Sequence, residues 1–311
     1  RWCCAPGCNA NSVSEYVTAA LLCLARRHGF ELQGRTIGVV GVGNVGTLVV
    51  RKALAMDLRV LPNDPPRQRR EGARLALPGM VDDLAFASLE QILAEADIVT
   101  LHVPLNRGGP DRTRRLAGPD FFERLKPGCI FINSARGAVM DSDALLEALD
   151  KGIVASAAID TWEDEPHVRT GLPERAALAT PHIAGHSFDG KVAGTLMVYR
   201  EACRFLGLEP AWTPDKLLPA APVPRVLVGS AERPGERVLE DVVKRVYDIE
   251  ADDARLRSIL KGERISGADF DALRRDYPVR REFRFTRLEL PGSSRHLRDK
   301  ARQLGFRVRE P

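Results

Sequence analysis

The sequence has little of what marks membrane, secreted or nucleic-acid-binding proteins. No apolar run in its 311 residues approaches the roughly 18 that a membrane span needs. Its six cysteines are too few for a disulfide framework, and the cluster Cys3, Cys4 and Cys8 lacks a further ligand pair at zinc-site spacing. A net charge of +4 leaves no electrostatic footprint for nucleic acid. We therefore expect a cytoplasmic protein with reduced thiols and no metal, membrane or nucleic-acid partner.

Strand-like and helical stretches alternate over the first two thirds of the chain. A capping-box pattern at 12–15 precedes the apolar run 17–24, which predicts a buried helix. Strand candidates follow at 36–40, 58–61, 97–102, 129–133 and 155–159, with helix candidates at 45–55, 89–95, 119–125, 142–151 and 188–206. Repeated strand–helix–strand units predict an α/β fold with a doubly wound parallel sheet, a Rossmann domain.

A proline-rich segment at 210–224 predicts a linker without regular structure. Beyond it the order of elements no longer alternates strictly. Strand-like stretches lie at 225–228, 280–290 and 306–309, and helical ones at 236–246 and 294–304. This order predicts a small C-terminal α+β domain.

A glycine-rich loop, Gly41-Val42-Gly43-Asn44-Val45-Gly46, follows the first strand and opens a helix. In that position the glycines permit a tight turn, the approach of a pyrophosphate and close helix packing. The N-terminus of the helix supplies free N–H groups to phosphates. The loop therefore predicts a dinucleotide site that includes Gly41, Gly43, Asn44, Val45 and Gly46.

Asp64 lies 23 residues after Gly41, at the end of the next strand. A carboxylate there can accept hydrogen bonds from ribose hydroxyls and would repel a 2′-phosphate, which favours NAD. Three nearby arginines leave the alternative open, because one of them could reach a 2′-phosphate. They are Arg67, Arg69 and Arg70.

Three downstream segments each place a polar residue after a predicted strand or strand-like stretch, where open α/β sheets bind ligands. They carry Arg136, Glu165 and His182. A guanidinium can hold a substrate carboxylate, an imidazole can take a hydroxyl proton, and a carboxylate can orient that imidazole. Together they suit the oxidation of a 2-hydroxy acid.

Each of these residues also has a purely structural interpretation. Arg136 could cap the next helix or pair with Asp141, His182 could be a core histidine, and Glu165 could belong to a solvated acidic run. The other histidines lack comparable context, and we interpret them as structural or surface residues. They are His28, His102, His167 and His296.

The chain resembles the D-2-hydroxyacid dehydrogenases over about residues 5–205. The resemblance rests on four ordered motifs: GVGNVG, NSARG, DTWEDEP and TPHIAG. It implies NAD as cofactor and a catalytic role for Arg136, Glu165 and His182. It further implies NAD contacts at Asp64, Val103, Ser134, Ala135, Asp160 and Gly185.

Within this family, further segments resemble the branch that oxidises 4-phosphoerythronate in pyridoxal phosphate (vitamin B6) biosynthesis. They include 5–10, 104–110 and 217–220. This resemblance implies a small phosphorylated 2-hydroxy acid as substrate and a homodimer formed through the C-terminal domain. His186 stands where we expect a tyrosine that helps hold the substrate, and we predict that His186 takes over this contact together with Arg136.

We expect the following organisation: 1–11 a remnant of a substrate-binding domain, 12–186 the NAD-binding domain, 187–209 a helix returning to the substrate domain, 210–224 the linker and 225–311 the dimerisation domain. Arg1 and the segment after it suggest a fragment, and a chain this short would be severely impaired as an enzyme.

Two other functions remain open at this stage. The first keeps the chemistry but changes the substrate to another 2-hydroxy acid, such as 3-phosphoglycerate or hydroxypyruvate. The second is a non-catalytic scaffold that senses NAD and binds partners through its C-terminal domain. Arg136, Glu165 and His182 together argue against the scaffold, because a sensor needs no proton acceptor.

Overall fold

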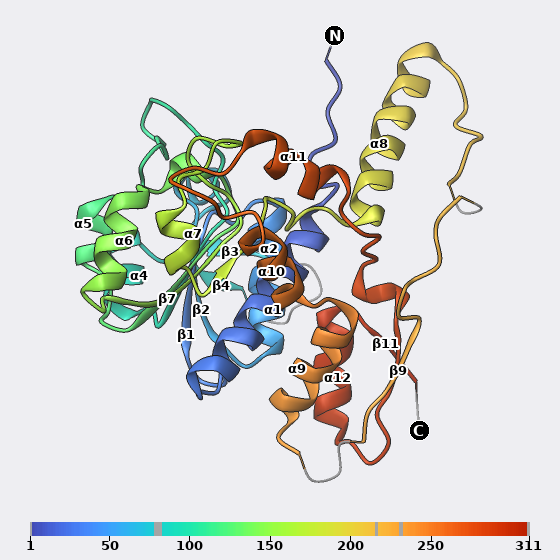
Figure 1. Ribbon diagram of the computed structural model, residues 1–311. Helices are drawn as coiled ribbons and strands as arrows, with labels where there is room; N and C mark the ends of the chain where they lie inside the picture. The colour runs from blue at the N-terminus through green and yellow to red at the C-terminus, as the bar shows by residue number, and fades with distance from the viewer. Residues whose placement is uncertain (1, 78–82, 215–216, 230–232, 310–311) are drawn as a thin grey trace.

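A six-stranded parallel sheet forms the centre of the protein, with strand order β2-β1-β5-β6-β7-β8. The computed structural model describes residues 2–77, 83–214, 217–229 and 233–309 (Figure 1). Its strands are β1 (Thr36–Val40), β2 (Arg59–Asn63), β5 (Ile98–Leu101), β6 (Cys129–Asn133), β7 (Val154–Ile159) and β8 (Leu178–Ala179). The predicted Rossmann sheet is confirmed, and its strand order reverses between β1 and β5, where such sheets bind ligands.

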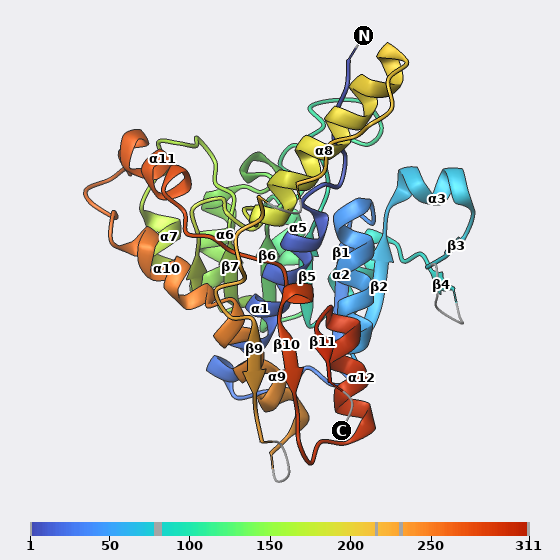
Figure 2. The same cartoon turned by 90° about the vertical axis from the view of Figure 1, so that its right-hand side faces the viewer.

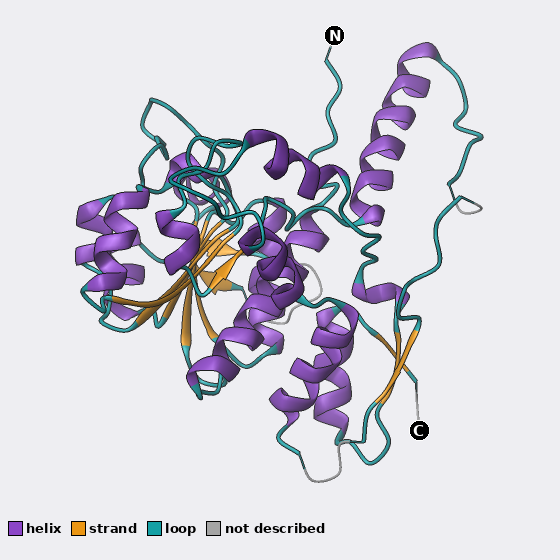
Figure 3. Cartoon of the chain, in the orientation of Figure 1, coloured by secondary structure: helices purple, strands orange, loops and turns teal. Residues whose placement is uncertain are grey.

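Helices cover both faces of the sheet, as Figure 3 shows. One face carries α1 (Ala10–His28) and α2 (Asn44–Ala55); the other carries α4 (Leu89–Glu95), α5 (Pro119–Glu123) and α6 (Ser142–Asp150). Along β6, Ile130 and Ile132 join the first core while Phe131 joins the second. This alternation explains the uninterrupted apolar strands, because both faces of a parallel sheet are buried.

The first helix does not begin at the predicted capping box. It starts at Ala10, so Ser12 and Glu15 lie inside α1, and both are fully buried. Ser12 donates to Glu282 (3.0 Å), and Glu15 accepts the Phe283 amide (2.9 Å). The two polar side chains therefore bond to the C-terminal region of the chain instead of capping their own helix.

Shorter elements complete the nucleotide-binding part and lead out of it. They are α3 (Pro65–Glu71), β3 (Arg74–Leu75), β4 (Leu84–Ala85), the 3₁₀ turn η1 (Gly137–Val139), α7 (Gly171–Arg175) and α8 (Phe188–Leu206). α8 has the predicted bounds and extends away from the sheet (Figure 1). The described residues between 208 and 224 form no helix or strand, as the proline-rich composition predicts. No described helix is long and apolar enough to span a membrane.

The C-terminal region builds a second, small sheet that lies apart from the large one (Figure 2). Its strands β9 (Arg225–Leu227), β10 (Arg287–Glu289) and β11 (Arg307–Val308) pair in parallel in the order β11-β10-β9. Two helices, α9 (Gly235–Val246) and α12 (Arg295–Leu304), pack on it. The α+β composition is as predicted.

The prediction of a long strand at 280–290 is wrong. Only Arg287–Glu289 form a strand, and Phe283–Phe285 form the 3₁₀ turn η2. Arg280, Arg281 and Glu282 are buried and bond to residues of α1 and to the start of α8. Alternation of apolar and polar residues indicated a strand, but the polar residues here point into protein contacts rather than into solvent.

Two further helices, α10 (Ile249–Arg257) and α11 (Gly267–Arg275), were not predicted. They pack beside the large sheet rather than on β9–β11. Asp253 accepts the Ala179 amide of β8 (2.7 Å), and Arg257 donates to the Ala176 carbonyl (2.7 Å). Residues 249–275 therefore extend the NAD-binding core, although they follow the linker in sequence.

Because the C-terminal region shares its core with α1 and α2, we predict that the whole chain unfolds in one transition. Phe283 is fully buried and stacks on Phe306 with ring centroids 4.5 Å apart. Phe283→Ala should lower the free energy of unfolding by about 3–5 kcal/mol in urea titrations followed by circular dichroism. Val279→Ala is the control, since Val279 is 45% exposed. A separate early transition of the C-terminal region would contradict this prediction.

Candidate active site

The glycine loop connects β1 to α2 with almost no spare space. A Cβ atom on Gly46 would lie 1.9 Å from the Gly41 carbonyl oxygen, so only glycine fits there. A Cβ on Gly43 would meet nothing within 4 Å, so the backbone at Gly43 faces open space. The loop thus combines close packing of α2 with an accessible backbone beside the N-terminus of that helix, as phosphate binding requires.

A cavity of ≈330 Å³ lies at the point where the strand order reverses. Gly41, Gly43, Asp64 and Val103 line it, as expected for NAD contacts. His102, at the end of β5, lines it too, and burial lowers the pKa of its imidazole to about 3. The sequence suggested a structural or surface role for this histidine. In the structure its uncharged imidazole lines the cavity.

The carboxylate of Asp64 fastens the glycine loop to the start of α3. Its oxygens accept the amides of Val42 (2.8 Å) and Arg67 (2.9 Å). The Arg67 guanidinium also bonds to the loop and to α2: it donates to the Val42 carbonyl (2.6 Å) and to the Thr47 hydroxyl (2.9 Å). Asp64 is only partly buried and lines the cavity, so a carboxylate oxygen can still meet a ribose.

All three arginines near Asp64 have acidic partners. Arg67 and Arg70 pair with Glu71 (2.6 and 2.8 Å), and Arg69 pairs with Asp111 (2.5 Å). A guanidinium engaged in this way must give up its partner before it can bind a 2′-phosphate. The arrangement therefore favours NAD over its 2′-phosphorylated form.

Glu165 and His182 form an ion pair or hydrogen bond at the ends of β7 and β8. Glu165 Oε2 lies 2.7 Å from His182 Nδ1, and Glu165 Oε1 accepts the Trp162 amide at 2.7 Å. Both side chains are partly exposed, at 22% and 29%. In the neutral tautomer that carries its proton on Nδ1, facing the Glu165 carboxylate, Nε2 is the nitrogen that can accept a proton from a substrate.

The loop carrying His182 is held from beneath by Asp160. This carboxylate is 1% exposed and accepts hydrogen bonds from Thr180 Oγ1 (2.6 Å) and from the amides of Ile183 (2.8 Å) and Ala184 (2.9 Å). Burial raises the pKa of Asp160. With its oxygens engaged inside the protein, Asp160 orients the His182 loop, and its NAD contact stays a prediction.

Arg136 follows β6 and is exposed. Its guanidinium donates to the Ala135 carbonyl (2.6 Å), and in the described part of the chain no acidic side chain pairs with it. Asp141, the alternative partner considered from sequence, instead caps α6 and lies 3.4 Å from Arg115. The Arg136 guanidinium is therefore available to a carboxylate ligand.

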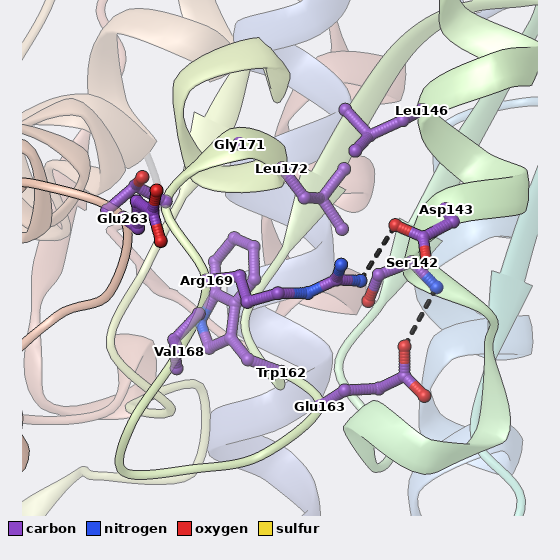
Figure 4. A pocket seen from close by; sticks show the side chains of 11 residues that line it. Ser142, Asp143, Leu146, Trp162, Glu163, Val168, Arg169, Gly171, Leu172 and Glu263 are labelled. Atoms are coloured by element: carbon purple, nitrogen blue, oxygen red, sulfur yellow. Dashed lines mark hydrogen bonds and ion pairs between the residues drawn. The ribbon is translucent and has the colours of Figure 1, made fainter.

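The three adjacent acids of the DTWEDEP motif, Glu163, Asp164 and Glu165, have three different partners, so they are not a solvated run. Glu163 accepts the Ser142 amide at 2.9 Å, which fastens the motif to α6, and Asp164 lies 3.4 Å from Arg264. Figure 4 shows Glu163 beside a second cavity of ≈330 Å³. No predicted site residue lines that cavity, and its Arg169 and Asp143 pair with each other at 2.7 Å.

The remaining predicted NAD contacts lie along the same edge of the sheet. Asn44, Val45 and Gly46 form the first turn of α2. Ser134 and Ala135 lie between β6 and Arg136, and the Ser134 hydroxyl is buried with no partner in the described structure. An unpaired buried hydroxyl at this edge fits a polar group of a bound cofactor.

Gly185 and His186 lie after His182 on the same loop. A Cβ on Gly185 would come within 2.2 Å of the Asn9 side chain, so Gly185 lets the start of α1 approach. The His186 ring meets Tyr277 edge to face at 6.0 Å. Burial, with smaller effects of Lys191 and Arg274, lowers the pKa of His186 to about 4, so this imidazole is neutral near pH 7.

The comparisons with known proteins agree with this site. The model of the D-isomer specific 2-hydroxyacid dehydrogenase NAD-binding domain matches residues 16–184, and a domain of unknown function matches residues 217–305. The chain belongs to the D-2-hydroxyacid dehydrogenase family. It is an NAD-dependent oxidoreductase of 2-hydroxy acids, as the motifs imply.

Among curated proteins, the chain is 44% identical to an erythronate-4-phosphate dehydrogenase from Edwardsiella ictaluri and 45% identical to one from Salinibacter ruber. The matches cover 90% and 89% of this chain and 70% of each relative. Among solved structures, NAD-dependent formate dehydrogenase from Staphylococcus aureus in complex with NAD has a TM-score of 0.55 at 26% identity, covering 67% of this chain and 65% of that one.

We predict that Gly43→Ala separates NAD binding from folding. The added methyl group meets no protein atom but occupies the open space that a pyrophosphate needs. The variant should keep the melting temperature of the wild type and bind NADH at least about tenfold more weakly in fluorescence titrations. Gly46→Ala is the contrasting variant and should lower the melting temperature. Unchanged NADH affinity in Gly43→Ala would place the pyrophosphate elsewhere.

Proposed function

We propose that the protein oxidises 4-phospho-D-erythronate to (R)-3-hydroxy-2-oxo-4-phosphooxybutanoate with NAD in pyridoxal 5′-phosphate biosynthesis. The observation that carries this proposal is the similarity to erythronate-4-phosphate dehydrogenases, which extends over 90% of the chain in the first match. That length includes the C-terminal region, which the match to the NAD-binding domain does not reach. The substrate of the relatives is therefore favoured over 3-phosphoglycerate or hydroxypyruvate.

The geometry supports a division of labour among the three proposed catalytic residues. NAD, when bound, accepts the hydride from C2 of the substrate. His182 takes the proton of the C2 hydroxyl at Nε2, while its Nδ1 proton stays on the bond to Glu165 Oε2 (2.7 Å). The Glu165 carboxylate stabilises the imidazolium that forms. Arg136 binds the substrate carboxylate and polarises the C2 oxygen, since its guanidinium has no acidic partner within the described ranges.

Two lesser parts of the proposal concern organisation and compartment. Six free cysteines suit a reducing compartment, and we propose that the protein acts in the cytoplasm. We propose that residues 1–11 belong to a substrate-binding half and that residues 187–209 return to it. We propose that His186 contacts the substrate together with Arg136.

The decisive assay follows NADH absorbance with 4-phosphoerythronate, with 3-phosphoglycerate in parallel, and reduction of hydroxypyruvate with NADH. It uses the 311-residue chain and the product of the whole open reading frame. Turnover of 4-phosphoerythronate alone is expected for the longer product, and severely reduced turnover for the 311-residue chain. Turnover of another acid alone would change the substrate, and NAD binding without turnover of any acid would favour a sensor.

We predict that Glu165→Gln lowers kcat about 10²–10⁴-fold at unchanged NAD affinity, because a neutral amide cannot stabilise the imidazolium. His182→Ala should lose at least as much. Glu163→Gln is the matched control: it changes an acid of the same loop that does not touch His182, and it should keep turnover near the wild type. Equal losses in Glu163→Gln and Glu165→Gln would point to loop damage instead of proton transfer.

We further propose that two chains pair through the C-terminal region. Leu227, on the edge strand β9, is 57% exposed, and an apolar side chain on an edge strand suits a contact with another chain. Light scattering should give the mass of a dimer for the wild type and of a monomer for Leu227→Glu. A monomeric wild type would contradict the proposal.

A further inference from the structure

The loop that carries His182 and His186 is bonded to protein on two sides. Asp160 holds its inner side, as described above. On its other side lie Arg280, Arg281 and Glu282, which belong to the matched domain of unknown function. These three residues lie about a hundred positions further along the chain.

Arg280 has the closest connection to this loop. Its guanidinium donates to the Ala184 carbonyl (3.1 Å), two residues after His182. Its own carbonyl accepts the Phe188 amide (2.8 Å), two residues after His186. One residue of the C-terminal region thus bonds to the loop beyond each of the two histidines.

The neighbours of Arg280 hold the start of α8. Arg281 Nε lies 3.0 Å from Asp189 Oδ1, and the Glu282 amide donates to Asp189 Oδ2 (2.8 Å). Ser187, which caps α8, bonds to Ser12 of α1, and Ser12 bonds to Glu282. The loop end is therefore fixed by an entirely buried set of polar groups.

Arg280 itself is fixed. It is 5% exposed, it donates to the Ser12 carbonyl (2.8 Å), and its guanidinium lies 3.7 Å from the centre of the Tyr247 ring. The planar fork joins two carbonyls from different segments, which a lysine ammonium on a flexible stem does not reproduce. Loss of the guanidinium would leave both carbonyls buried without this donor.

We propose that Arg280 is a positioning residue: it ties the C-terminal region to the loop of His182 and His186 and thereby sets the place of both imidazoles. This gives the domain of unknown function a direct part in the active site of its own chain. The expected effect on catalysis rests on the proposed function, because His182 is the proposed proton acceptor. The structural effect on the loop does not.

Arg280→Met removes the fork and keeps a similar volume, and Arg280→Lys keeps the charge. We expect Arg280→Met to lower kcat roughly 10²-fold, as a displaced catalytic group does, at an NAD dissociation constant within about twofold of the wild type. Arg280→Lys should recover part of the loss. The measurements are kcat and KM for 4-phosphoerythronate, NADH fluorescence titration and the melting temperature.

Thr286→Val is the matched control. Thr286 is 1% exposed in the same region and donates to the Val223 carbonyl (2.7 Å), outside the loop. The control should lower the melting temperature and keep kcat. A kcat loss in Thr286→Val equal to that in Arg280→Met, or wild-type kcat in Arg280→Met, would overturn the proposal. If Arg280→Met does not fold, Arg280→Lys is the test. A reduced kcat at unchanged NAD affinity in Arg280→Lys supports the proposal, and a wild-type kcat overturns it.

A second readout does not need turnover. In spectra of protein labelled with ¹⁵N-histidine, with His182 assigned from His182→Gln, the Nδ1 and Nε2 shifts report the tautomer of His182. Arg280→Met should change these shifts and Thr286→Val should not. Unchanged shifts in Arg280→Met would overturn the proposal even if the substrate assignment failed. If the wild type does not turn over 4-phosphoerythronate but the His182 shifts still differ between Arg280→Met and the wild type, the positioning role is supported and only the substrate assignment fails.

Discussion

The active site depends on one buried carboxylate, that of Asp160. It comes from the end of β7 and binds Thr180 and the amides of Ile183 and Ala184, which follow β8. These bonds hold His182 in a left-handed backbone conformation (φ 53°) that a non-glycine residue seldom adopts. Burial raises the pKa of Asp160, whereas the bonds it accepts lower it, so the same contacts that fix the loop also stabilise the charge.

The polar contacts between the C-terminal region and α1 carry a desolvation penalty, because they bury ionisable groups. Glu15 is fully buried, and desolvation raises its pKa to about 7 despite the opposing charges of Lys52 and Arg280. Lys52 has a lowered pKa for the same reason and donates to the Leu304 carbonyl (2.6 Å). An apolar interface would avoid this cost. The buried hydrogen bonds instead allow one alignment of the segment 280–283 along α1, because each donor must meet its acceptor. An apolar contact is less directional and defines the alignment less well.

Much of the fold and of the site could be predicted because the signals are local. The apolar strands and the glycine loop depend on a few neighbouring residues, and three motifs at the ends of adjacent strands bring Glu165 and His182 together. The errors concern long-range contacts. Ser12 and Glu15 were predicted to cap a helix, because the sequence around them does not show that their true partners lie more than 260 positions away. Three adjacent charged residues, Arg280–Glu282, inside a predicted strand were the one signal that this segment is not an ordinary strand.

The neutral state of His186 fits the chemistry proposed for its neighbour. His182 must gain a positive charge when it takes a proton, and a second cation four residues away on the same loop would oppose that. Burial and the nearby cations Lys191 and Arg274 keep the pKa of His186 near 4, so it remains uncharged near pH 7. A neutral imidazole still offers one N–H donor, the capacity that a tyrosine hydroxyl would supply. A histidine at position 186 therefore supplies a donor without adding a charge to the loop of the proposed proton acceptor.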